Sequence, residues 1–124
     1  MRHTLLASTC FVALAGTASA ETTISNTVNG PVRTSTVNQG AADDLLINST
    51  GVVNGTAAGG VIIDSNHKLT NQGTIQIGSV NDVVGVEVDA GVTGGITHTG
   101  KIIVDEAYTP TDADNDGVLG GSFA

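Results

Sequence analysis

The chain has 124 residues, enough for one small domain, and its twelve acidic residues outnumber the four basic ones to give a net charge of −8. A surface of this sign repels nucleic acid and anionic lipid, so we expect no nucleic-acid partner. There are two Phe, one Tyr and no Trp, and the other apolar residues are mainly Val, Ile, Leu and Ala mixed with Gly, Thr and Asn. That composition favours strands and tight turns over helices.

Residues 1–20 have the three parts of a secretory signal peptide. A basic start at Arg2 is followed by an apolar stretch from Leu5 to Ala15 and by the small residues Ala18-Ser19-Ala20. The apolar stretch is shorter than the roughly 20 residues that a membrane-spanning helix needs. We therefore expect cleavage after Ala20 and an exported protein at the cell surface, in the outer membrane or outside the cell. Cleavage would remove Cys10, the only cysteine, so the mature chain would form no disulfide.

Residues 21–40 are rich in Thr and Asn. Two apolar-alternating stretches, residues 22–28 and 32–37, predict two short strands separated by the turn residues Asn29-Gly30-Pro31. A repeat array needs an atypical, polar unit over its end. We expect residues 21–40 to form an irregular N-terminal capping coil.

An internal repeat occupies residues 41–104, the region we assign to solenoid repeats. The segments 69–77 and 96–104 share the pattern [LI]-T-x-x-G-x-I-x-[IV] at an offset of 27, and a weaker copy at 47–53 precedes the first of them by 22. A second element, G-V-x-[IV]-D, occurs at 60–64 and 85–89, an offset of 25. The repeating unit is therefore strand, turn, strand, and recurs every 22 to 27 residues.

Each predicted strand is too short to fold alone, but stacked copies would form ladders of aliphatic residues about 4.8 Å apart. The sequence therefore predicts an all-β chain, a short right-handed parallel β-helix (β-solenoid) that follows a cleaved signal peptide. The recurring Gly fits a bend with positive φ or a close approach of two backbones. Asn71 is expected in a turn, stacked near Ser49 and His98. The predicted interior residues are Val61, Ile63, Leu69, Ile75, Ile77, Val86, Val88, Ile96, Ile102 and Val104.

Residues 105–124 read as an acidic, Gly-rich tail or linker. Within them Asp112, Asp114 and Asp116 alternate and are followed by Gly117, which matches the first six positions of a calcium-binding loop. The twelfth position, where such loops place a bidentate acid, is Phe123. The tail is therefore predicted either to bind calcium through these three carboxylates, with no other cofactor, or to be a solvated acidic linker.

No arrangement of residues predicts catalysis. His67 and His98 do not align in the repeat, which argues against a metal pair, and both read as turn residues. The adjacent acids Asp43-Asp44 and Asp105-Glu106 would point to opposite faces of a strand, so neither pair converges on one bond. There is no G-x-S-x-G motif. We predict that the chain is not an enzyme.

Imperfect N-x-G-x-I-x-[IV] coils, such as residues 71–77, that follow a signal peptide and a Thr/Asn-rich first coil resemble the start of an autotransporter passenger. The resemblance spans nearly the whole mature chain and implies a β-helical, adhesin-like structural segment with an unknown surface or host receptor. It also implies a C-terminal translocator barrel as the only membrane contact. No row of about ten-residue amphipathic strands is present, so we expect an N-terminal fragment of a longer protein or a truncated reading frame. The alternatives are a calcium-dependent extracellular binding module and a fragment of a β-helical polysaccharide-degrading enzyme.

Overall fold

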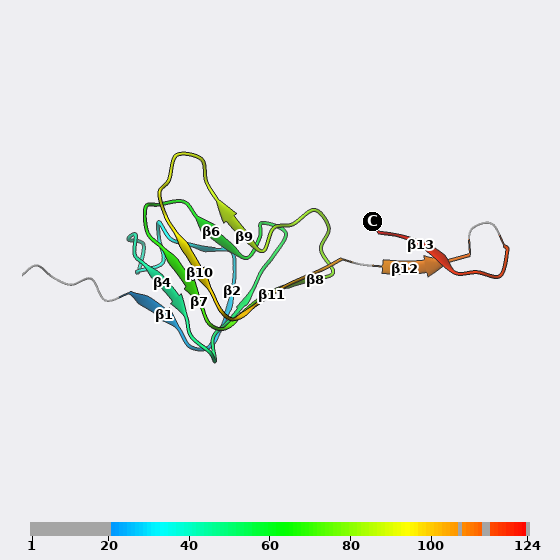
Figure 1. The fold of residues 1–124 in the computed structure, drawn as a ribbon, viewed down its shortest axis with the longest axis horizontal. Coiled ribbons are helices and arrows are strands. Elements are labelled where there is room, and N and C mark those ends of the chain that lie inside the picture. The colour runs from blue at the N-terminus through cyan, green and yellow to red at the C-terminus, as the bar shows by residue number, and fades with distance from the viewer. Residues whose placement is uncertain (1–20, 107, 113–114, 124) are drawn as a thin grey trace, which may run out of the picture.

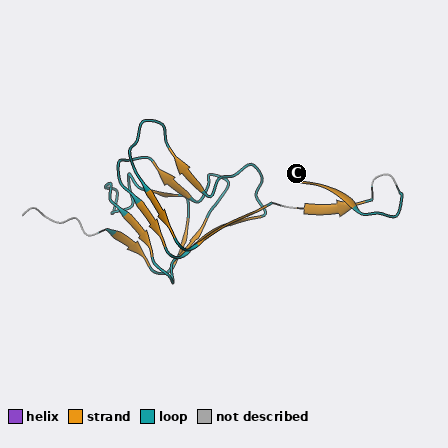
Figure 2. Ribbon diagram, in the orientation of Figure 1, coloured by secondary structure: helices purple, strands orange, loops and turns teal. Residues whose placement is uncertain are grey.

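The computed structural model of the protein describes residues 21–106, 108–112 and 115–123, and in these ranges it contains strands and no helix (Figures 1 and 2). Strands β1 to β11 form three parallel sheets that wrap around one axis. The predicted signal peptide, residues 1–20, lies outside the described residues.

Each sheet is made of strands that recur at intervals along the chain. The first sheet contains β1 (Thr22–Ile24), β4 (Leu45–Ile47), β7 (Leu69–Asn71) and β10 (Ile96–His98). The second contains β2 (Thr27–Asn29), β5 (Val52–Asn54), β8 (Thr74–Gly78) and β11 (Lys101–Asp105). The third contains β3 (Val32–Arg33), β6 (Val61–Ile63) and β9 (Val86–Val88).

Three coils therefore each place one strand in every sheet, and a fourth coil supplies only β10 and β11. All pairs within the three sheets are parallel, so backbone groups bond between successive coils. The predicted all-β parallel solenoid is confirmed.

Two of the three repeat offsets give the correct register. Leu69 lies beside Ile96 and Ile75 beside Ile102, both 27 residues apart, and Val61 lies beside Val86, 25 residues apart. Equivalent aliphatic residues consequently stack from coil to coil, as the pattern predicted.

The offset of 22 is correct for only one sheet. Val53 does pair with Ile75, but Leu45 pairs with Leu69 and Ile47 with Asn71, an offset of 24. The reason is a longer turn between β4 and β5, in which the side-chain oxygen of Asn48 accepts the Thr50 and Gly51 N–H groups, each at 3.0 Å. The prediction that Asn71 stacks near Ser49 is therefore wrong.

The first coil has three strands where the sequence predicted two. Residues 22–28 divide into β1 and β2, which belong to different sheets because β1 pairs with β4 and β2 pairs with β5. After β3 the chain forms a longer connection, residues 34–43, which we call the first-coil loop. Val37 of this loop packs against the core.

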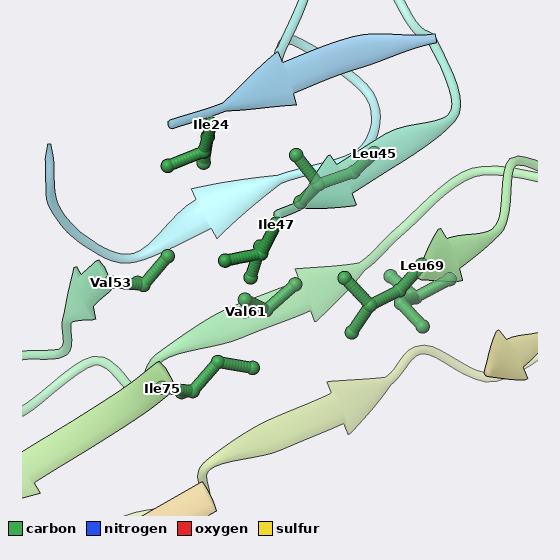
Figure 3. Packing of buried hydrophobic residues seen from close by; sticks show 8 residues of the cluster. Ile24, Leu45, Ile47, Val53, Val61, Leu69 and Ile75 are labelled. Atoms are coloured by element: carbon green, nitrogen blue, oxygen red, sulfur yellow. The ribbon is translucent and has the colours of Figure 1, made fainter. Parts of the chain in front are cut away.

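The core is a column of aliphatic side chains along the solenoid axis, and Figure 3 shows them directed toward one another from all three sheets. Five predicted interior residues are fully buried: Val61, Ile63, Leu69, Ile75 and Ile77. The prediction missed five other buried aliphatic residues. Four of them, Ile24, Leu45, Ile47 and Val53, lie in strands of the first two coils that match the repeat poorly, and Ile62 occupies the unspecified position of the G-V-x-[IV]-D element.

The other predicted interior residues occupy the expected columns but are not enclosed. Val86 is partly buried, whereas Val88, Ile96, Ile102 and Val104 are 42–48% exposed. They lie on β9, β10 and β11, which are the last strands of their sheets, so no further coil among the described residues covers them.

The repeated Gly marks one corner of the solenoid, before each strand of the second sheet. A Cβ at Gly51, Gly73 or Gly100 would collide with backbone atoms of the preceding coil, and none of the three has a positive φ. The close approach of backbones therefore explains the glycine, and a positive φ does not. In the first coil that the structure describes, the corresponding residue is Asn26.

After β11 the chain leaves the solenoid. Strands β12 (Tyr108–Thr111) and β13 (Gly120–Phe123) pair with each other as an antiparallel hairpin. Figure 1 shows this hairpin beyond the end of β11, away from the stacked coils. The sequence, read as a connector and tail, had not predicted it.

Candidate functional site

The acidic loop between β12 and β13 is organised by one carboxylate. Asp112 accepts the Asp116 N–H through one oxygen and the Gly117 N–H through the other, each at 3.1 Å. Asp116 in turn accepts the Val118 N–H at 2.8 Å, and Gly117 has a positive φ of 83°. The sequence pattern thus does produce a tight turn at its Gly.

Calcium binding by this loop stays a prediction. Asp112 and Asp116 lie on the same turn, while Asp114 lies outside the described residues. Among the residues that the structure describes, no group of three or more His, Cys, Asp or Glu side chains is placed to hold a metal ion. The observed hydrogen bonds give Asp112 a role in shaping the turn.

Asp64 ties the first-coil loop to the second coil, a role that sequence reasoning missed. Its carboxylate accepts hydrogen bonds from the Ser35 hydroxyl and N–H, both at 2.8 Å, and from Arg33 at 3.1 Å. Burial raises the pKa of Asp64, but the hydrogen bonds from Ser35 and Arg33 outweigh it and hold the pKa below its usual value of 3.8. The available signal was the Asp that ends each G-V-x-[IV]-D element.

Asp43 performs a similar task at the other end of that loop. It is buried and accepts hydrogen bonds from the Thr22 hydroxyl at 2.9 Å and from the Asn38 amide at 3.2 Å. Because Thr22 belongs to the first coil, the loop is fastened at both ends by a carboxylate. Asp43 and Asp44 lie outside the strands, so the predicted alternation along a strand does not apply to them, although their carboxylates do have different partners.

Asp44 contacts the turn before β7. Its carboxylate accepts the Lys68 N–H at 3.0 Å and lies 3.1 Å from Nδ1 of His67. The pKa of Asp44 is lowered chiefly by the hydrogen bond from the Lys68 N–H. His67 and the Lys68 ammonium group add to this effect, whereas burial opposes it. This arrangement pins one coil to the next.

The two histidines differ in their location and in their partners. His67 lies outside the strands, in the connection between β6 and β7, whereas His98 lies in strand β10 and was wrongly read as a turn residue. Nδ1 of His98 is 3.1 Å from the amide nitrogen of Asn71, which is buried. Asn71 ends strand β7 and does not lie in a turn, so that part of the prediction is wrong. Its side chain does accept the Gly73 N–H and donate to the Lys101 carbonyl, so the predicted bonding of its amide to backbone is confirmed.

Two open grooves run along the second sheet. One, of about 300 Å³, lies over the Gly corner and is lined with hydroxyl, amide and ammonium groups, among them Ser49, Gln72, Thr99 and Lys101. The other, of about 290 Å³, includes Asn54, Gln76, Ile103 and Asp105. Neither contains an aromatic ring or a pair of histidines, so the described surface offers hydrogen bonds along an extended face.

Among the described residues, no helix is long and apolar enough to cross a membrane. Comparison of the chain with models of known protein families, with curated proteins and with solved structures finds no match. The fold and the contacts above are therefore the basis for any functional conclusion.

Proposed function

We propose that the chain is an exported, non-catalytic structural segment of the autotransporter-passenger type, whose role is to extend from the cell and present an adhesin-like surface. The observation that supports this best is the parallel solenoid itself: its aliphatic residues form one axial column, and the outward residues Asn29, Asn54 and Gln76 stack as a polar row. Such a coil lengthens by repetition without a new core, which suits a spacer or display function.

The outward face of the second sheet is suited to contact with a large partner surface. The outward amides of Asn29, Asn54 and Gln76 form a ladder along the second sheet, with Gln76 donating to Asn54 at 2.8 Å and Asn54 to Asn29 at 3.4 Å. Ordered polar rows of this kind offer many weak hydrogen bonds to a protein or glycan surface. A surface or host receptor is therefore the proposed partner, and the binding free energy would come from many weak contacts spread over a large interface.

Export is tested by expressing the full 124-residue chain in a Gram-negative bacterium and sequencing the N-terminus of the product. We expect a periplasmic protein that begins at Glu21. The matched variant Ala18→Arg with Ala20→Arg removes the small residues that the signal peptidase reads and should keep the leader attached. Wild-type protein that stays in the cytosol with residues 1–20 intact would refute export.

Adhesion is tested separately by joining the chain to an outer-membrane translocator barrel and displaying it on a non-adherent strain. Binding of these cells to epithelial monolayers should exceed that of cells carrying the barrel alone, and external protease should abolish the difference. Equal binding by the two strains, with display confirmed by antibody, would refute the adhesin role.

A further inference from the structure

The last strand of the second sheet, β11, is an uncovered edge. It pairs with β8 on one side, and within the described residues no strand lies on the other. All five of its residues are exposed, including Ile102, Ile103 and Val104 at 42–47%. In the part of the chain that the structure describes, nothing covers this edge, because the following hairpin strands pair with each other. A long, flat, apolar edge is a template for pairing with another strand.

The free backbone groups of β11 belong to two residues. The Lys101 N–H bonds to Gly73 and the Asp105 carbonyl accepts the Ser79 N–H, so both residues direct their backbone groups toward β8. Backbone groups alternate in direction along a strand paired on one side, so Ile103 also faces β8, whereas Ile102 and Val104 direct N–H and C=O outward. An incoming strand must therefore bond to Ile102 and Val104.

The sequence of this strand, Lys101-Ile102-Ile103-Val104-Asp105, is complementary to itself when reversed. An antiparallel copy centred on Ile103 places Ile102 opposite Val104 of the second copy, the pairing in which two residues exchange both backbone hydrogen bonds. The same register places Lys101 opposite Asp105 of the second copy, twice by symmetry. Opposite charges facing each other across two strands stabilise the pair.

We propose that two copies of this chain associate through their β11 edges, antiparallel and centred on Ile103. The second sheets of the two copies then form one continuous sheet, with four new backbone hydrogen bonds and two Lys101–Asp105 ion pairs across the symmetry axis. Ile102 and Val104, which are exposed in the single chain, meet their counterparts at the open end of the solenoid. This inference stands on β11 alone and does not depend on the proposed function.

A closed dimer, and not a filament, follows from the difference between the two ends. The interior residue Ile24 of the first coil is only 8% exposed, and Val37 of the first-coil loop packs against the core. Among the described residues, the first end therefore offers no matching apolar surface for head-to-tail growth. An interface made of the same patch on both subunits closes at two.

The test is the solution mass of the full chain, measured by sedimentation equilibrium over a range of concentrations. We expect twice the monomer mass for wild type. Lys101→Asp and Asp105→Lys each set like charges opposite each other twice and should weaken association by about tenfold or more. The double variant restores the opposite charges in exchanged positions and should recover the dimer, which also controls for net charge.

A disulfide tests the register. In the proposed pairing the two Ile103 residues face each other in a non-hydrogen-bonded position, where Cα atoms lie about 4.5 Å apart, close enough for a disulfide. In a Cys10→Ser background, Ile103→Cys should form a cross-linked dimer on mild oxidation. Gln76→Cys, in the same outward column one strand further in, should not.

A wild-type chain that stays monomeric up to millimolar concentration would overturn the proposal, as would a mass that grows beyond two copies. Equal association of the wild type and both single charge variants would overturn it too. So would equal cross-linking at positions 103 and 76. Circular dichroism of each variant checks that the exposed substitutions leave the coils folded.

Discussion

The first and the last coil both direct aliphatic residues toward the interior, yet those of the first coil are more enclosed. Ile24 in β1 is 8% exposed, whereas Ile96 in β10, of the same sheet, is 48% exposed. The difference lies outside the strands. At the first end a loop, residues 34–43, packs Val37 against the core and is fastened by Asp43 and Asp64. At the last end the chain departs into a hairpin.

The comparison shows that in a solenoid the enclosure of a residue depends on its neighbouring coil more than on its own strand. A rung with coils on both sides is buried, as Leu45 and Leu69 are. A rung with a coil on one side needs a substitute on the other, either a loop or a second molecule. Four comparisons, each between two variants or two conditions, test how far stability depends on these neighbouring segments.

The largest effect is expected for truncation of the enclosed isoleucine. Ile24→Ala should lower the free energy of unfolding by about 2–4 kcal/mol, because it removes buried methylene groups and leaves a cavity. Ile96→Ala, at a half-exposed position, should cost less than about 1 kcal/mol. Urea unfolding, with Lys101→Asp added to both variants to keep copies apart, measures the two values. Equal losses would contradict the proposed difference between the ends.

At the Gly corner the expected order of the two ends is reversed. A substitution in the last coil should cost more stability there than one in the first coil. Gly100→Ala should destabilise the chain by about 1–3 kcal/mol, since its Cβ would meet the backbone of Gly73 and Gln72 in the preceding coil. Asn26→Ala, at the same corner of the first coil, should change stability by less than about 0.5 kcal/mol. Thermal unfolding followed by circular dichroism distinguishes the two, and a tolerated Gly100→Ala would disprove the close-approach explanation.

The fastening of the first-coil loop predicts an acid-sensitive first end. Asp64→Asn should cost about 1–2 kcal/mol at pH 7, because the charged acceptor of Ser35 and Arg33 is lost. The folded pKa of Asp64 lies below its usual 3.8, so this stabilisation is fully present above that value and disappears as pH falls through the lower folded pKa. Wild type and variant should therefore converge as pH falls below the folded pKa of Asp64.

The control for this experiment is Asp89→Asn. Asp89 ends the same motif in the next coil but is exposed, so its substitution should have little effect at any pH. Urea midpoints measured from pH 7 to pH 2 would give both curves. A constant difference between wild type and Asp64→Asn across this range would show that the charge of Asp64 does not matter.

The smallest effect is expected for calcium. The loop around Asp112 belongs to the hairpin and already directs both oxygens of that carboxylate to backbone N–H groups. We expect the thermal midpoint of the coils to be the same with calcium and with a chelator. A midpoint that rises with calcium concentration would instead support the calcium-dependent binding module, because a ligand that binds only the folded state stabilises it.

Sequence reasoning succeeded where the repeat was regular. The copies at 69–77 and 96–104 share every spacing, so one offset gave the register of two sheets. It failed where a turn changed length. The two additional residues before β5 moved Ile47 beside Asn71, a shift that periodicity cannot reveal because each strand carries only one or two interior residues.

In the candidate site, too, sequence reasoning succeeded for a local turn and failed for contacts between coils. The Asp-rich motif correctly predicted a tight turn at Gly117, because Gly readily adopts positive φ there. The carboxylates that hold the first-coil loop were not recognised, since Asp64 and its partners Ser35 and Arg33 are about 30 residues apart in sequence. Only coiling of the chain brings them together.

By itself the sequence determined the local chemistry of this protein: short aliphatic strands, Gly or Asn at the corners, and a repeat length that requires stacking. Those features are local, and each follows from the steric and hydrophobic properties of a few adjacent residues. The tertiary structure decided which rungs are enclosed and which edge stays open. That outcome depends on what lies above and below each coil: Ile96 has the same kind of local sequence as Leu69, but in the described chain no coil lies beyond it.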